Sequence, residues 1–120
     1  MAIFIQNSLT KKKEEFIPLV PGEVKMYTCG VTVYDDCHVG HARSLFIFDC
    51  LRKYLGYREY KVKFVRNVTD VDDKIINRSH EEGVSFETIR DRYINNYYRD
   101  LKALEIDKAD FEPMATENIY

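Results

Sequence analysis

Apolar and polar positions follow clear periods along this chain, and in the first half they predict a strand, a helix and a second strand. Residues 25–29 form an apolar-rich run that predicts a core strand. From 41 to 55, apolar side chains recur every three or four positions, which predicts an amphipathic helix that ends at Gly56. At 60–65, apolar residues alternate with lysines, as in a strand. The order strand, helix, strand indicates a parallel βαβ unit.

Helical patterns fill most of the second half. Residues 72–82 predict a helix that stops at Gly83, and Ser85 is placed to cap the start of another. Residues 110–113 break this last helix, and Thr116 is expected to cap one more. The apolar residues that share the face of the helix after Ser85 predict its buried side: Phe86, Ile89, Tyr93, Tyr97, Leu101 and Leu104.

The N-terminal residues predict less regular structure. Residues 3–5 are apolar and predict a short edge strand, whereas residues 11–23 are charged, contain Pro and Gly, and predict a loop or hairpin connection. A sheet usually has about 4 to 6 strands, and only two are clear here. We therefore expect an α/β fold, with a parallel sheet and flanking helices, of which residues 1–120 are the front portion of a larger domain.

Composition and charge narrow the function classes. The chain has 120 residues, of which 45% are hydrophobic and 32% charged, as in globular proteins. Its net charge of -2 does not suggest a dedicated nucleic-acid-binding domain, which is usually basic. Three cysteines without a C-x-x-C pair favour a reducing, cytoplasmic location over a disulfide framework. No apolar run reaches the roughly 20 residues of a membrane helix, so no membrane contact is expected.

The stretch 29–41 joins the end of the first core strand to the start of the first helix. A helix start offers backbone N–H groups and a positive dipole end, both of which suit a phosphate. Gly40 allows a ligand close to the backbone, and His38 and His41 are hydrogen-bond donors at the same helix start. Cys29 lies at the carboxyl end of the strand, where ligands of open α/β sheets bind.

A second polar loop, 67–74, follows the second strand. Because the carboxyl ends of parallel strands meet at one edge of a sheet, we expect the two loops to be spatial neighbours. Thr69 and Asp70 come at the strand end and are candidates to hold an amino group. Asp72 and Asp73 are sufficiently explained as stabilising residues at a helix start.

Other interpretations of these residues remain open at this point. The two histidines could simply cap the helix or pack, and a single cysteine such as Cys29 is often a small buried side chain. A closed structural metal cluster of Cys29, Cys37, His38 and His41 is a further alternative, although its spacing matches no common zinc-finger pattern.

Two motifs carry a resemblance to a known family. The segment YTCGVTVYDDCHVGHAR followed by FVRNVTDVDDKII resembles the front of cysteinyl-tRNA synthetases, which are class I aminoacyl-tRNA synthetases. The resemblance extends over nearly the whole chain. It implies a Rossmann-like catalytic domain of the HUP type that activates L-cysteine with Mg-ATP, and then transfers it from cysteinyl adenylate to tRNA(Cys). It also implies one zinc ion that binds the thiolate of the substrate.

The resemblance assigns roles to individual residues. It implies that Cys29 is the first zinc ligand, with the remaining ligands beyond residue 120, and that the histidines form the catalytic ATP signature. Since one ligand cannot hold catalytic zinc, the 120-residue chain alone is expected to be inactive. The residues implied in the ATP site are Thr32, His38, Gly40, His41 and Ser44, and those implied in the cysteine site are Cys29, Gly30 and Thr69.

Two rival functions follow from the same residues. The cysteine ligase of mycothiol biosynthesis shares cysteine activation but has an amino-sugar acceptor, and its members usually carry TPYD where this chain has Thr32-Val33-Tyr34-Asp35. Val33 therefore favours the tRNA enzyme. A non-catalytic nucleotide-binding module would keep the sheet but could lose Cys29, His38 or His41, and all three are present.

Overall fold

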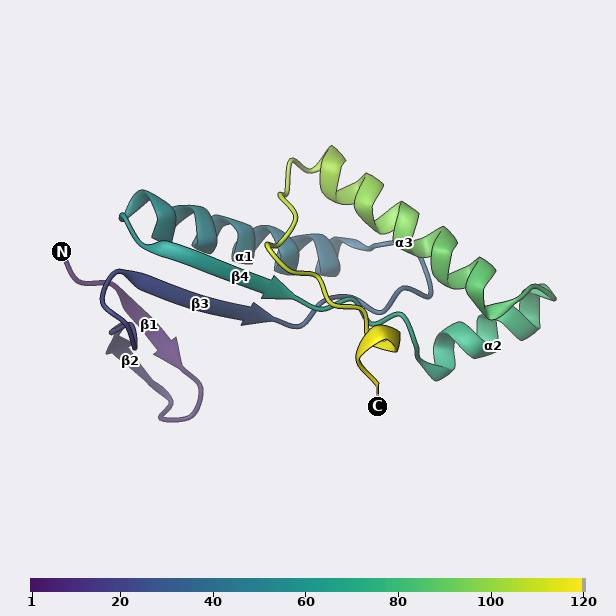
Figure 1. Ribbon diagram of the computed structural model, residues 1–120, viewed down its shortest axis with the longest axis horizontal. Helices are drawn as coiled ribbons and strands as arrows, with labels where there is room; N and C mark the ends of the chain where they lie inside the picture. Colours follow the sequence, from purple (N-terminus) through teal and green to yellow (C-terminus); the bar gives the residue numbers. More distant parts are fainter. Residues whose placement is uncertain (120) are drawn as a thin grey trace.

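Two parallel strands, β3 (Glu23–Thr28) and β4 (Lys61–Arg66), form the centre of the fold in the computed structural model, which describes residues 1–119 (Figure 1). Helix α1 (Val39–Tyr57) connects the two strands and packs against β4. The predicted βαβ unit is confirmed. Phe64 on β4 is fully buried because α1 covers its side of the sheet, with the guanidinium of Arg52 5.3 Å from the centre of the Phe64 ring.

Helices α2 (Asp73–Glu82) and α3 (Phe86–Ala103) pack against each other, and the chain then returns beside β4 (Figure 1). This returning segment, residues 107–114, pairs in parallel with β4 and its continuation. The Arg66 amide donates to the Phe111 carbonyl at 3.0 Å and the Val68 amide to the Pro113 carbonyl at 2.9 Å. The sequence predicts residues 110–113 only as a helix breaker. They extend the sheet instead, so that β4 has a neighbour on each side.

A separate antiparallel hairpin precedes this sheet. It consists of β1 (Phe4–Asn7) and β2 (Lys12–Glu15) and projects from the end of the molecule away from α2 (Figure 1). The predicted strand near residues 3–5 exists, but it is not an edge of the parallel sheet. Its partner lies within the charged segment 11–23. The sequence pattern did not predict β2 as a strand, because all four of its residues are charged and give it no apolar face: Lys12, Lys13, Glu14 and Glu15.

The helix ends follow local capping chemistry. Helix α2 starts after Asp72, whose side chain accepts from the Lys74 amide, and it ends at Gly83, whose φ of 65° is left-handed. Ser85 caps α3 through the Thr88 amide, as predicted. Helix α1 starts two residues earlier than predicted, at Val39. The helix expected after Thr116 is a single 3₁₀ turn, Thr116–Asn118.

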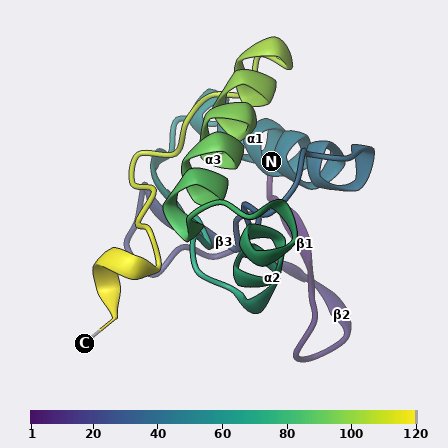
Figure 2. The same cartoon turned by 90° about the vertical axis from the view of Figure 1, so that its right-hand side faces the viewer.

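Two apolar clusters form the core. Five of the six predicted face residues of α3 are buried or pack against these clusters, but Leu104 is 45% exposed because it follows the last helical residue. In Figure 2, α2 and α3 lie in front of the sheet and α1. The first cluster contains Val33, Val68, Ile75, Ile89 and Tyr93, and the second contains Leu45, Tyr97, Leu101 and Ile106.

The chain is more extended than its length alone would require. Its radius of gyration is 16.9 Å, whereas a compact chain of this length has about 14 Å. Large apolar side chains such as Ile17, Leu19 and Tyr57 are mostly exposed. Within residues 1–119, no helix has both the length and the apolar character needed to cross a membrane.

Candidate functional site

The two polar loops continue the parallel pairing of β3 and β4 beyond the ends of these strands. The Thr69 amide donates to the Val31 carbonyl at 3.2 Å, and the Val33 amide donates to the Thr69 carbonyl at 3.1 Å. Thr32 and Thr69 are therefore bridge partners. The prediction that the two loops are neighbours is confirmed, and both run as short extended segments at first.

Alternation along these extended segments separates core residues from site residues. Val33 and Val68 are each 1% exposed and belong to the same apolar cluster. Because successive side chains of an extended segment point to opposite sides, Thr32 and Thr69 lie on the side away from this cluster. Both threonines are only partly buried. The valines thus anchor the loops and leave the threonine hydroxyls at the carboxyl edge of the sheet.

Cys29 lies where β3 ends, and its side chain is exposed. Its position agrees with a ligand-binding role more than with a packed core role. The next residue, Gly30, passes so close to the second loop that a Cβ added there would lie 1.6 Å from the Asn67 carbonyl oxygen. Only glycine fits this position, and the Gly30 amide donates to Oδ1 of Asn67 at 2.9 Å.

The two histidines form the start of α1 and contact each other. Nδ1 of His38 accepts from the Gly40 amide at 3.0 Å, and Nδ1 of His41 accepts from the His38 amide at 3.4 Å. The rings stack, with centroids 3.8 Å apart and planes 24° from parallel. The two imidazoles therefore do cap the helix, as one of the open interpretations held.

Capping uses only one nitrogen of each ring. Because both Nδ1 atoms accept, each neutral ring carries its proton on Nε2, which remains a donor for a ligand. Burial lowers the pKa of His41, and the neighbouring His38 lowers it further, so the neutral ring is favoured. Capping and ligand binding are thus compatible roles for this pair.

The start of α1 is also electrostatically suited to an anion. Its first turn, residues 39–42, contains no acidic side chain, whereas the first turn of α2 has Asp73 directly after its cap Asp72. The helix dipole of α1 is therefore not compensated by a carboxylate at its start. Ser44 is exposed and lies one turn after Gly40, on the same side of α1.

Hydrogen bonds divide the site residues into two groups. The first group lies at the ends of β3 and β4, and Asn67 links its members. The sequence analysis did not predict this role for Asn67. The second group is at the start of α1, and within residues 1–119 no hydrogen bond joins the two groups. The first group contains Cys29, Gly30, Thr32 and Thr69, and the second contains His38, Gly40 and His41.

The alternative of a closed metal cluster is not assembled. Across residues 1–119, no group of three or more His, Cys, Asp or Glu side chains is placed to hold a metal ion. Cys37 instead packs against the second apolar cluster. Burial raises the pKa of the Cys37 thiol, and the nearby Asp100 and Asp36 raise it further, which disfavours the thiolate that a metal would need.

Asp70 does not have the role suggested by its position at a strand end. It is fully buried, and its carboxylate accepts from the Thr116 amide at 2.9 Å and from the Thr116 hydroxyl at 2.5 Å. The carboxylate therefore ties the second loop to the 3₁₀ turn near residue 116. Thr69 alone remains as the candidate to contact an amino group.

Comparison with known proteins gives the class to which this chain belongs. Residues 15–120 match the family described as tRNA synthetases class I (C) catalytic domain. The chain belongs to this family. A solved structure of Mycobacterium tuberculosis methionyl-tRNA synthetase in complex with methionyl-adenylate has a similar fold, with a TM-score of 0.69, 21% identity, and coverage of 74% of this chain and 18% of that one. This likeness supports the Rossmann-like fold.

Curated relatives are more similar in sequence. The chain is 58% identical to a Cysteine--tRNA ligase of Persephonella marina and 56% identical to one of Aquifex aeolicus, in each case over 99% of this chain and 24% of the relative. A Cysteine--tRNA ligase of Geobacter sulfurreducens is 53% identical over 99% of this chain and 25% of that protein. The chain thus spans about a quarter of the length of the curated relatives it matches.

Proposed function

We propose that the full-length protein containing this chain is a cysteine–tRNA ligase. It would activate L-cysteine with Mg-ATP to cysteinyl adenylate and then transfer the cysteinyl group to tRNA(Cys). The identity of 58% with a Cysteine--tRNA ligase, over nearly the whole chain, carries this proposal. The arrangement of the site supports it, since an exposed thiol and a helix start suited to an anion both lie at the carboxyl edge of the β3–β4 sheet.

The start of α1 would bind the phosphates of ATP. Nε2–H groups of His38 and His41 would donate to phosphate oxygens while the cysteine carboxylate attacks the α-phosphorus and pyrophosphate leaves. Donors that strengthen only in the transition state are worth about 10²–10³ in rate. Gly40 keeps this helix start free of a side chain, and the hydroxyls of Thr32 and Ser44 are further candidate contacts for the nucleotide.

The ends of β3 and β4 would bind the amino acid. The Thr69 hydroxyl would accept from the substrate ammonium group, beside the Gly30 backbone. Cys29 would contribute one thiolate to zinc, and the other ligands would come from the rest of the full-length protein, because residues 1–119 do not gather a metal-binding group. Zinc would supply selectivity for a thiol over a hydroxyl. We expect the 120-residue chain alone to be inactive for this reason.

Cysteine-dependent exchange between ATP and pyrophosphate in the full-length protein tests this proposal. We expect exchange with cysteine and far less with serine or without an amino acid. Cys29→Ser should lower zinc content and exchange together, whereas Cys50→Ser, at an exposed position on α1, should change neither. Absence of cysteine-dependent exchange would refute the proposal.

A second measurement separates the tRNA enzyme from its nearest rival. Transfer of labelled cysteine to tRNA(Cys) is expected, and transfer to an amino sugar instead would indicate the mycothiol-type ligase.

A cytosolic location agrees with three cysteines that are all free thiols.

A further inference from the structure

One side chain, that of Asn67, makes hydrogen bonds both to the Cys29–Gly30 corner and to the Thr69 hydroxyl. Cys29 and Gly30 follow β3, whereas Thr69 lies two residues beyond Asn67 in the loop after β4. An amino acid that uses both groups must fit a fixed span between them. Asn67 lies directly after β4, where it can reach both loops.

The amide of Asn67 contacts three partners at once. Its Oδ1 accepts from the Gly30 amide at 2.9 Å and from the Tyr27 hydroxyl at 3.1 Å. Its Nδ2 donates to Oγ1 of Thr69 at 3.1 Å. One planar group therefore links Tyr27 on β3, and Gly30 just beyond β3, to the loop after β4.

The partners also determine which way the amide faces. A backbone N–H can only donate, so Gly30 requires the oxygen of the amide, and the nitrogen must then face Thr69. The hydrogen bond from Nδ2 occupies one lone pair of the Thr69 hydroxyl. Within residues 1–119 no other group donates to this hydroxyl, so its second lone pair could accept from an ammonium group.

Backbone contacts hold the two loops together on either side of this side-chain link. The two loops approach so closely at Gly30 that no Cβ fits there, and two residues further along they are bridged between Thr32 and Thr69. Between these contacts, the Asn67 amide is the side-chain link. Asn67 is partly buried, so its bonds are only partly exposed to competition from water.

We propose that Asn67 is a positioning residue that holds the Thr69 hydroxyl at a set distance and direction from the Cys29–Gly30 corner. It thereby determines how tightly the protein binds an amino acid whose ammonium group meets Thr69 while its side chain lies on the side of Cys29, where the proposed zinc would be held. This inference rests on the proposed function. Asn67 acts through Thr69 and the Gly30 amide and has no part in phosphate binding at the start of α1.

Exchange kinetics of the full-length protein test this proposal. Asn67→Ala should raise the KM for cysteine about tenfold, as expected for the loss of one to two hydrogen bonds. The KM for ATP should change less than about twofold, because within residues 1–119 the Asn67 side chain makes no hydrogen bond to the histidine pair or to Thr32. Asn77→Ala, at an exposed position on α2, is the matched control and should leave both constants unchanged.

A double-mutant cycle with Thr69→Val separates positioning from general destabilisation. If Asn67 acts through Thr69, the double variant should raise the KM for cysteine no further than the larger single variant. The proposal would be overturned if the double variant showed the product of the two single effects. It would also be overturned if Asn67→Ala raised the KM for cysteine and the KM for ATP equally, or left the KM for cysteine unchanged.

Two safeguards keep the outcome interpretable. If Asn67→Ala does not fold, Asn67→Ser serves instead, since its hydroxyl suits a partly buried polar position but is too short to reach Thr69, and the same rise in KM is expected. If the unmodified protein shows no cysteine-dependent exchange, the proposed function fails. If the unmodified protein shows this exchange but the Asn67 variants behave like the Asn77→Ala control, only the positioning role fails.

Discussion

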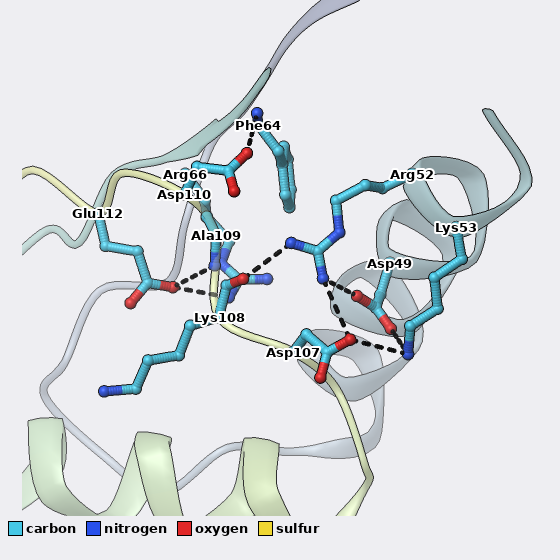
Figure 3. A network of polar contacts seen from close by, with 10 residues as sticks. All are labelled: Asp49, Arg52, Lys53, Phe64, Arg66, Asp107, Lys108, Ala109, Asp110 and Glu112. Carbon is cyan, nitrogen blue, oxygen red and sulfur yellow. Dashed lines mark hydrogen bonds and ion pairs between the residues drawn. The ribbon is translucent and has the colours of Figure 1, made fainter. Parts of the chain in front are cut away.

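Two groups of polar residues flank the same strands, and they use their hydrogen-bonding groups in opposite ways. The open site, at the carboxyl ends of β3 and β4 and the start of α1, leaves donors and a thiol available. The closed cluster, between α1, β4 and the returning segment, uses its carboxylates to neutralise its own cations (Figure 3). The closed cluster comprises Asp49, Arg52, Lys53, Arg66, Asp107, Asp110 and Glu112.

Arg66 is the most buried member of the closed cluster. It is 1% exposed, and its Nη2 donates to Glu112 at 2.8 Å (Figure 3). The same carboxylate accepts from the Ala109 amide at 3.2 Å and from the Tyr98 hydroxyl at 2.8 Å. Within residues 1–119, Nε and Nη1 of Arg66 have no hydrogen-bond partner, so Glu112 alone neutralises this buried charge.

Arg52 and Lys53, which both pair with Asp49, connect α1 to the returning segment. Asp49 is 3% exposed and binds Arg52 at 2.6 Å and Lys53 at 2.7 Å. Arg52 also donates to the Lys108 carbonyl at 2.8 Å (Figure 3). Both groups lie near strand residues of one sheet, and each leaves donors without a partner. The difference between them is access, because the free donors of Arg66 are buried whereas Cys29 and His38 are exposed, and accessible free groups are what mark a candidate binding site.

The largest effect is expected on stability, when the buried ion pair of the closed cluster is removed. Glu112→Ala should lower the free energy of unfolding by about 3–5 kcal/mol, because it leaves Arg66 buried without a counter-charge. Urea titration of the full-length protein at pH 7 measures this loss. The matched control is Glu81→Ala, at an exposed position on α2, which should stay within about 0.5 kcal/mol. A loss below about 1 kcal/mol for Glu112→Ala would contradict a closed, structural role.

In the open site, the corresponding change should affect rate and leave stability nearly unchanged. His41→Asn should slow adenylate formation about 10²–10³-fold, since it removes an Nε2 donor at the start of α1. Pre-steady-state formation of cysteinyl adenylate measures the rate, and urea titration measures stability. His80→Asn, in the last turn of α2, is the control and should keep the full rate. A slow His41→Asn variant that is also strongly destabilised would place His41 with the structural residues.

The periodicity of the sequence predicted the main helices and the two parallel strands, but it did not predict contacts between residues far apart in the chain. The strand at 60–65 and the helices after Ser85 and Asp72 have patterns that local rules explain. The return of residues 110–113 to β4 has no such pattern, because hydrogen bonds from Arg66 and Val68 to distant carbonyls determine it. The closed cluster was missed for the same reason, since Arg66 and Glu112 are 46 residues apart.

The candidate site shows a similar division. The end of a strand and the start of a helix indicated Cys29 and the two histidines, and the structure leaves the thiol exposed and the Nε2 atoms available. Asp70 was misjudged because a carboxylate at a strand end can equally bind a distant backbone amide, here that of Thr116. Asn67 was overlooked, although an asparagine directly after a strand at this edge is a signal that could have identified it.

A smaller effect should follow from a single carboxylate of the closed cluster. Oδ2 of Asp110 accepts from the Phe64 amide at 2.7 Å (Figure 3). Asp110→Ala should cost about 1–3 kcal/mol of unfolding free energy, because this amide belongs to a buried residue and would lose its partner. Asp110→Asn retains an acceptor oxygen and should recover most of the loss. Equal losses for the two substitutions would show that the charge, rather than the acceptor, is what matters.

The smallest expected effect concerns protonation in the open site. Burial, and secondarily His38, lower the pKa of His41 in the folded protein below its ordinary value of about 6.5. The stability that this group contributes is therefore fully present above about pH 6.5 and is lost as the pH falls through the lowered folded value. His38→Asn removes the neighbouring imidazole but keeps the backbone amide that donates to Nδ1 of His41. The pKa of His41, followed by NMR in histidine-labelled protein and assigned with His41→Gln, should consequently rise toward its ordinary value. An unchanged or lower pKa in His38→Asn would mean that the two stacked rings are not electrostatically coupled, and burial alone would then keep His41 neutral as a donor.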